Sequence, residues 1–296
     1  MKFLKKHRLL ILACLILMVN SRATYATLPE LQDCPSSSGP WGYLRATYIS
    51  ELPARLVFFK IDQGVSFNRL LDQRMSNLHY SGPGAVLAFS RNVLSPGYIS
   101  EINFASIGFH YTKPGHGGTQ IYNPAFGIGY MYLHSMNTGS NVGLYLGGRA
   151  DAFGNLRIVP SLGNSFLFTD FVAEIKPEAR LELSPYLLNR YWNIDLSMSA
   201  ALAGFSLRHP EYATVYQIDS EGGVNMFENE SLLLYPGNYA HLNTGIFLRG
   251  SLGGQYNPNG YRIGYSWDYY RISGRHNLTV NNTSHSLVLE LYFMVN

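Results

Sequence analysis

Long segments of the chain alternate apolar and polar residues with a period of two. In residues 167–183 the odd positions from Leu167 to Leu183 are uncharged and mostly apolar, whereas most even positions from Asp170 to Glu182 are charged. Successive side chains of a strand point to opposite faces, so this pattern predicts an amphipathic β-strand. About 9–11 tilted residues cross a bilayer, whereas strands of globular proteins average about 5–6 residues. The alternation therefore predicts an all-β fold, and its length favours membrane-crossing strands over those of a soluble β-sandwich.

Ten segments show the alternation in a strong or weaker form. They are 41–50, 84–94, 98–111, 121–134, 141–152, 167–183, 193–204, 242–255, 261–270 and 284–296. The joints between them alternate short and long, and the long ones are 51–83, 112–120, 153–165, 208–238 and 273–283. A membrane barrel with an even strand number has both ends on one side, with short turns there and longer loops opposite. Residues 41–296 are therefore expected to form a single antiparallel transmembrane β-barrel of ten strands, or of twelve if 55–61 and 212–218 add strands.

The N-terminus has the order of a secretory signal peptide. A basic segment, residues 2–8, precedes the unbroken apolar run 9–19, and small residues follow up to Ala26. The apolar run is too short for a membrane-spanning helix, which needs about 20 residues. We expect a signal peptide over residues 1–26, followed by an N-terminal periplasmic tail over residues 27–40.

Removal of this segment changes the net charge. Five of the 22 basic residues and none of the 19 acidic ones lie in it, which leaves 17 against 19 and a net charge near −2. A nucleic-acid-binding domain needs a basic patch, so no nucleic-acid partner is expected. Cys34 is then the single remaining cysteine, and it has no partner for an internal disulfide.

The composition fits an amphipathic wall. Charged and aromatic residues each make up 14% of the chain, and the mean hydropathy is −0.04. Such a chain has enough apolar surface to exclude disorder. Aromatic residues cluster near the predicted strand ends, where they suit the membrane–water boundary. They are Trp41, Tyr43, Tyr98, Tyr111, Tyr122, Tyr191, Trp192, Tyr256, Tyr261 and Tyr292.

The signal peptide, the alternating strands and the C-terminal strand Ser284-His-Ser-Leu-Val-Leu-Glu-Leu-Tyr-Phe293 resemble those of Gram-negative outer-membrane β-barrels. The chain departs from many of these barrels because it continues beyond Phe293 instead of ending on an aromatic residue. Its Gly-, Tyr- and Asn-rich composition is similar to that of uncharacterised barrels of Bacteroidetes. The resemblance implies a location in the cell outer membrane, contact with outer-membrane lipid, and delivery to the barrel-assembly machinery through the C-terminal strand.

Charged residues on the polar parity are predicted to face the lumen. Barrels of about eight strands are filled by side chains, and wide channels need 16–18 strands, so ten or twelve enclose a narrow lumen. Ion pairs between the inward residues would fill it, or the same residues would line a narrow polar pore. The candidates are Arg149, Asp151, Asp170, Glu174, Lys176, Glu178, Arg180, Asp195, Arg249, Arg262, Asp268 and Glu290.

Catalytic motifs are weak. Outer-membrane phospholipases and lipid A deacylases use a His with a Ser and an acidic or Asn partner, and residues 134–141 lack the spacing of their motif. His285 and Ser286 are adjacent, so on a strand they point to opposite faces. The other histidine candidates are His209 with Asp219, as in the Asp/His pairs of omptin proteases, and His110 with His116 as a loop metal site. None is supported by a full motif, so no catalytic residue, metal or cofactor is predicted.

The function expected from the sequence is that of a porin-like narrow channel, or of a surface-loop binding or structural protein without catalysis. The alternative is an outer-membrane hydrolase acting on lipid, of the phospholipase or lipid A deacylase type. The extracellular ligand is not identified by any motif.

Overall fold

The computed structural model describes residues 55–95, 97–115, 119–136, 142–160, 167–187, 190–208, 230–252, 259–273 and 279–295. Several predictions fall on residues outside these ranges. They are the signal peptide 1–26, the tail 27–40, the strand 41–50, the cysteines, and the candidates His116, His209 and Asp219.

The described residues form fourteen strands. They are β1 (Leu56–Asp72), β2 (His79–Ser95), β3 (Tyr98–Pro114), β4 (Ile121–Ser135), β5 (Val142–Ile158), β6 (Leu167–Leu183), β7 (Tyr186–Leu187), β8 (Arg190–Tyr191), β9 (Asn193–Ala200), β10 (Ala203–Arg208), β11 (Glu230–Leu234), β12 (Tyr239–Ser251), β13 (Gly260–Ser273) and β14 (Thr279–Met294). Among these residues no helix is long and apolar enough to cross a membrane.

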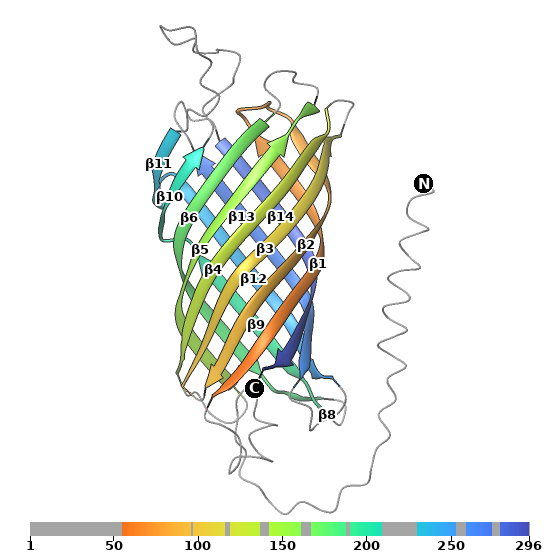
Figure 1. The fold of residues 1–296 in the computed structure, drawn as a ribbon, viewed down its shortest axis with the longest axis vertical. Coiled ribbons are helices and arrows are strands. Elements are labelled where there is room, and N and C mark those ends of the chain that lie inside the picture. The colour runs from red at the N-terminus through yellow and green to blue at the C-terminus, as the bar shows by residue number, and fades with distance from the viewer. Residues whose placement is uncertain are drawn as a thin grey trace, which may run out of the picture. The chain divides into compact units, whose positions relative to one another are not determined.

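Twelve strands form one antiparallel sheet that closes on itself (Figure 1). Sequential strands are neighbours from β1 to β6, and β14 pairs with β1 along nearly their whole length. The sheet closes because β9, which pairs with β12, also pairs with β6. The remaining two strands, β7 and β8, form a small hairpin of their own.

The barrel wall has ten strand positions, which confirms the predicted count of ten. β10 and β9 lie one after the other along β6, beside residues 170–175 and 178–183 respectively. β11 and β12 lie in the same way along β10 and β9. Each of these pairs is one wall strand interrupted once, at residues 201–202 and at the turn 235–238. The extra strands therefore lengthen the wall instead of widening the barrel.

Two predicted loops contain strands. Most of the predicted loop 51–83 is β1 and the start of β2, and β1 contains nearly all of the segment 55–61 that the twelve-strand alternative treated as a strand. The predicted loop 208–238 contains β11, and its segment 212–218 lies outside the described residues. These loop predictions are wrong because many wall strands are 17 residues long and extend past the 9–11 residues that cross a bilayer. In β1 the alternation is also weakened by an outward Gln63 and an inward Gly64.

The predicted alternation of short and long joints is wrong as well. One barrel end carries the connections 73–78, 115–120, 159–166, 209–229 and 274–278, and the other carries 96–97, 136–141, 184–192 and 252–259. Only 209–229 is markedly long. We call the end that carries it the long-loop end, and the opposite end, where β1 begins and β14 ends, the termini end.

The wall separates residue types by face. Large apolar side chains stand exposed on the outer parity of the strands, for example Phe67 and Ile128 at 54% and 58% exposure. On the inner parity, charged side chains such as Arg157 and Asp170 are almost fully buried. A single-layered wall with an apolar exterior and a polar interior is the arrangement of a membrane barrel.

A charge on the outer face tests this arrangement. Ile128 lies at the middle of β4 and points outward. We expect Ile128→Arg to reduce the free energy of unfolding from lipid vesicles by about 2–4 kcal/mol, because a cation at the bilayer midplane carries that cost. The control is His134→Arg on the same face near the end of β4, where the cost falls to about 0–1 kcal/mol. Equal losses in urea titrations of the two variants would contradict membrane insertion of this face.

Candidate functional site in the barrel interior

The twelve candidate lumen residues lie on six neighbouring wall strands: β5, β6, β9, β12, β13 and β14. Eleven of them take part in ion pairs. The twelfth, Arg180, is buried without an ion pair among the described residues. The interior charges gather in three groups along the barrel, which are described from the long-loop end to the termini end.

At the long-loop end three arginines share two aspartates. Arg74 Nη2 lies 2.8 Å from Asp72 Oδ2 and 3.0 Å from Asp170 Oδ1. Arg157 contacts both carboxylates, with Nη1 3.1 Å from Asp72 Oδ2, and Arg208 Nε lies 3.2 Å from Asp170 Oδ1. All five side chains are at most 3% exposed. We call these residues the Asp170 cluster, and it ties together β1, β5, β6 and β10.

The connection 73–78 contributes one arginine to this cluster. Burial acts to lower the pKa of Arg74, but the negative charges of Asp170 and Asp72 outweigh it and hold the pKa above its ordinary value. Arg157 also donates from Nη2 to the hydroxyl of Tyr270, at 2.6 Å, and so joins β13 to the cluster. Ion pairs thus fasten the barrel at this end from opposite walls.

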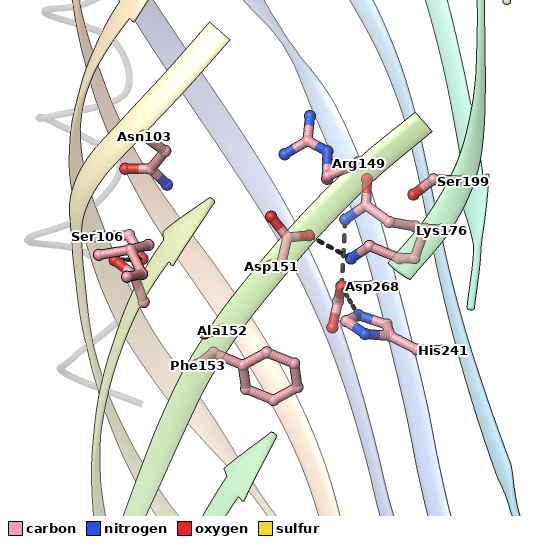
Figure 2. Close-up of a pocket in the computed structure, with 13 residues that line it drawn as sticks. Asn103, Ser106, Arg149, Asp151, Ala152, Phe153, Lys176, Ser199, His241 and Asp268 are labelled. Atoms are coloured by element: carbon pink, nitrogen blue, oxygen red, sulfur yellow. Dashed lines mark hydrogen bonds and ion pairs between the residues drawn. The ribbon is translucent and has the colours of Figure 1, made fainter. Parts of the chain in front are cut away.

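In the middle of the barrel His241 bridges two carboxylates. Its Nδ1 lies 2.7 Å from Glu174 Oε1. Its Nε2 lies 2.8 Å from Asp268 Oδ2, a contact drawn in Figure 2. Lys176 Nζ in turn lies 2.9 Å from Glu174 Oε1 and 2.7 Å from Asp151 Oδ2. These five residues form a continuous chain of charges across β5, β6, β12 and β13, which we call the central chain.

A cavity of about 220 Å³ lies beside the central chain. Its walls are Asn103, Ser106, Gly127, Ile128, Arg149, Asp151, Ala152, Phe153, Lys176, Ser199, His241, Asn243 and Asp268. Figure 2 shows the polar groups of Asp151, Lys176 and His241 directed toward one another. The cavity has room for a few water molecules or one small polar molecule.

At the termini end Arg262 and Arg249 share Asp195. Arg262 Nε and Arg249 Nη2 lie 2.9 Å and 2.5 Å from Asp195 Oδ2. Arg262 Nη1 also lies 3.1 Å from Glu290 Oε2, and Tyr292 donates its hydroxyl to the same oxygen at 2.5 Å. All five residues come from β9, β12, β13 and β14, which are consecutive in the wall.

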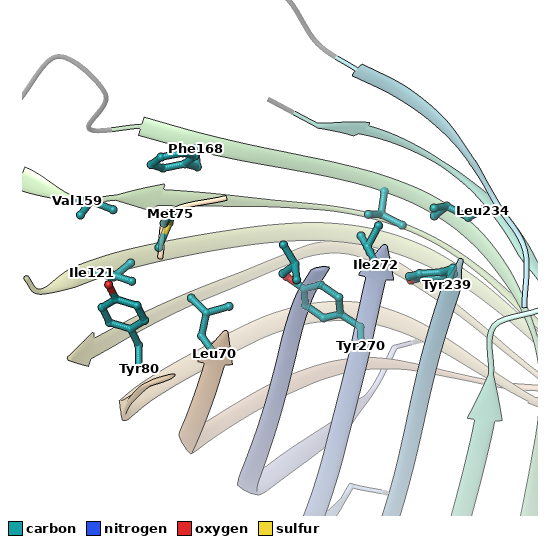
Figure 3. Close-up of a cluster of buried hydrophobic side chains, with 12 residues drawn as sticks. Leu70, Met75, Tyr80, Ile121, Val159, Phe168, Leu234, Tyr239, Tyr270 and Ile272 are labelled. Atoms are coloured by element: carbon teal, nitrogen blue, oxygen red, sulfur yellow. The ribbon is translucent and has the colours of Figure 1, made fainter. Parts of the chain in front are cut away.

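Two buried apolar clusters lie toward the two ends of the interior. The loop-end apolar cluster, shown in Figure 3, consists of Leu70, Met75, Tyr80, Ile121, Val159, Phe168, Val172, Leu234, Tyr239, Tyr270, Ile272 and Val280. The termini-end apolar cluster consists of Leu56, Phe58, Leu94, Ile99, Met131, Leu133, Tyr145 and Tyr292. The cavity lies between them, since its Phe153 packs against the first cluster and its Arg149 Nη2 lies 3.5 Å from Met131 Sδ of the second.

Sequence reasoning missed a large part of the interior. Lys60 bridges Asp62 and Glu101 at 3.0 Å and 2.9 Å, and β1, which holds Lys60 and Asp62, was predicted as a loop. Arg157 and Arg208 lay at or beyond the predicted strand ends. The parity that placed Arg149 inward continues unbroken to Arg157, so longer predicted strands would have included it.

The histidines named as catalytic candidates do not meet a serine and an acid among the described residues. His134 is exposed on the outer face, and His285, also exposed, has its Nδ1 2.5 Å from the Tyr265 hydroxyl. His110 points inward, where its Nδ1 lies 3.3 Å from Ser66 Oγ and close to Asn68. Within the described ranges no group of three or more His, Cys, Asp or Glu is arranged to hold a metal ion.

No protein-family model and no curated protein matches the sequence. Among solved structures, the chain is similar to outer membrane protease OmpT from Escherichia coli, with 11% identity, a TM-score of 0.43, and 81% and 96% of the two chains covered. It is also similar to the Neisserial surface protein A, with 12% identity, a TM-score of 0.30 and 79% and 97% covered. The toluene transporter TodX of Pseudomonas putida has 10% identity, a TM-score of 0.27 and 87% and 95% covered. The fold assignment rests on the strand pairing of this chain.

Removal of one shared carboxylate tests the Asp170 cluster. Asp170→Asn leaves Arg74 and Arg157 with Asp72 and removes the carboxylate that pairs with Arg208. We expect a loss of about 3–5 kcal/mol in the free energy of unfolding, because a buried charge is left uncompensated. The matched control is Asp151→Asn, whose partner Lys176 keeps Glu174. The free energy of unfolding lost in Asp151→Asn should be clearly smaller in the same urea titration. An equal loss would show that Asp170, although shared by three arginines, contributes no more to stability than Asp151.

Proposed function

We propose that the protein is an outer-membrane β-barrel whose lumen is closed, and that it acts through its external surface and loops as a binding or structural protein, without catalysis. The observation that carries this proposal is the occupied interior. Apolar clusters fill both ends, and ion-paired side chains lie between them. Of the two sequence-based possibilities for the lumen, this filling favours the plug over the pore.

The physical reason lies in the path that an ion would have to take. A hydrophobic constriction excludes water and stops conduction by dewetting. In the proposed closed lumen each apolar cluster acts as such a constriction, and side chains such as Phe58 and Ile272 are at 0% exposure. Most of the charges between the clusters are held in ion pairs with neighbouring and opposite strands, so they are not free to coordinate a passing ion.

The exterior supports the membrane location. The outward parity is apolar over the central part of the wall strands, and the predicted signal peptide would export the chain. The segment Ser284–Phe293, which resembles the assembly signal of outer-membrane barrels, lies within β14, the strand that closes the barrel against β1. This position supports the barrel-assembly machinery as a partner of that strand. The connection 209–229 is the longest in the barrel and is the proposed site of any ligand specificity.

Conductance in planar bilayers tests the closed lumen. We expect the purified wild-type protein to give no steady single-channel steps. Phe58→Ala combined with Ile272→Ala, which removes one fully buried side chain from each apolar cluster, should give brief openings above the baseline. Phe67→Ala, on the outer face, is the control and should stay at the baseline.

Heat-modifiable migration on gels first establishes that each variant is folded. Stable, ion-selective steps from the wild-type protein would contradict the proposal and favour a narrow channel. Lipid hydrolysis that is lost in His134→Ala or His285→Ala would instead favour the hydrolase.

A further inference from the structure

The strands separate charge by sign as well as by polarity. Every Asp and Glu whose side chain is described in the wall points inward and is buried or half-buried, and the list comprises Asp62, Asp72, Glu101, Asp151, Asp170, Glu174, Glu178, Glu182, Asp195, Asp268 and Glu290. The exposed charges on the outer parity are all positive, namely Arg69, Arg91, Lys113 and Arg271. None of these four has an ion pair among the described residues. The outer face therefore offers cations without neutralising partners.

Three of the outward cations lie together near the long-loop end. Tyr269 of β13, Thr283 of β14, Arg69 of β1, Ser81 of β2 and Lys113 of β3 stand opposite one another in a single row across five adjacent strands. Arg271 lies two residues beyond Tyr269, opposite Asn281. We call the residues Arg69, Ser81, Lys113, Arg271, Asn281 and Thr283 the outer polar patch.

The cations of the patch lie on alternate strands. β14 separates Arg271 from Arg69, and β2 separates Arg69 from Lys113. Neighbouring strands are about 4.8 Å apart, so each interval between cations spans about 10 Å across the wall. The flexible stems of two neighbouring cations can reach over the short polar side chain between them, Thr283 or Ser81. Each interval thus forms a candidate phosphate-binding position, in which two cations and a hydroxyl can contact one phosphate.

An apolar and aromatic surface lies directly on the membrane side of the patch. Trp267 stacks on Tyr269, with ring centroids 6.0 Å apart and an angle of 9° between the planes. Phe67 lies in the same row of the wall as Trp267, and Leu287 lies one row further into the membrane region; they are 54% and 61% exposed. From Val57 to Phe67 the outward residues of β1 are apolar apart from Gln63, which is a length that crosses a bilayer. The patch therefore lies where headgroups meet acyl chains.

We propose that the outer polar patch binds a bisphosphorylated glycolipid of the outer leaflet, with its phosphates in the two intervals between Arg271, Arg69 and Lys113 and its acyl chains along Trp267, Phe67 and Leu287. Charge complementarity selects an anionic headgroup, and the neighbouring exposed apolar surface selects a ligand with acyl chains. The two intervals match a headgroup with two phosphates. This inference rests on the proposed membrane location but does not depend on whether the lumen conducts.

Native mass spectrometry of the full chain in detergent tests the site with bisphosphorylated lipid A as the probe. We expect Arg69→Gln combined with Arg271→Gln to weaken binding of this lipid by about ten-fold, because charge-assisted bonds to phosphate are lost. Lipid A stripped of both phosphates should bind the wild-type protein as weakly as the intact lipid binds the double variant. Arg91→Gln is the matched control, since Arg91 is also outward and exposed and has no ion pair with any described residue, but lies near the termini end, opposite Phe59 and Ile102.

Two results would overturn the site. Equal loss in Arg91→Gln would mean general attraction between an anionic lipid and any outward cation, and undiminished binding of the stripped lipid would remove the phosphate from the interaction. Binding of an anionic soluble protein or a second copy of the chain in place of the lipid, lost in the same double variant, would assign the patch to that occupant instead. The proposed closed lumen is tested separately by conductance, and steady conductance of the wild-type protein would contradict it. The patch variants are expected to leave the conductance unchanged.

Discussion

The structure depends on one constraint: a closed wall one sheet thick must place every side chain either outside or inside. Successive side chains of a strand point to opposite faces, so each residue faces either the exterior or the lumen. A wall of one layer has no second layer that could bury a polar group pointing outward. The described carboxylates of the wall all lie inside, so they must be neutralised there. Arg157, Arg208 and Lys176 on the same inner parity supply that neutralisation. The interior ion pairs thus follow from the architecture of the wall, whatever their role in function.

This constraint also supports the proposed closure of the interior. A barrel of ten wall strands has a narrow lumen, and long side chains from facing walls meet across it. Arg157 of β5 reaches Tyr270 of β13, and Arg74, just after β1, reaches Asp170 of β6 on the opposite side of the ring. Buried polar groups cost free energy unless they have partners, so ion pairs form wherever opposite charges come within reach. In the proposed closed lumen, the apolar clusters near each end exclude water, and the polar cavity of about 220 Å³ lies between them.

The sequence predicted the all-β class, the count of ten, and nine segments that overlap wall strands, because all of these follow from local alternation. The same alternation put the twelve charged residues on one parity, and their neighbours in the wall are also predictable from chain order. The location of β1 was not predictable in this way, because Gln63 and Gly64 weaken its pattern and its 17 residues exceed what a bilayer requires. The ion-pair partners of each charge were not predictable either. Asp72 and Asp170 share Arg74 because barrel closure brings together strands that are far apart in the sequence.

The ion-paired interior and the exposed cations of the outer face favour the outer surface over the lumen as the functional part of the protein. If the lumen were the working part, charges would be expected along an open path, whereas eleven of the twelve candidate lumen residues are held in ion pairs. Among the described residues, the exposed cations of the wall without an ion pair are on the outer face, and three of them lie near the long-loop end. Lys60 and Arg69 of β1 illustrate the difference, since nine residues apart on the same strand the first is buried between two carboxylates and the second is exposed without one. The proposed partner of Arg69, Lys113 and Arg271 therefore lies outside the chain, in the anionic headgroup of a membrane lipid.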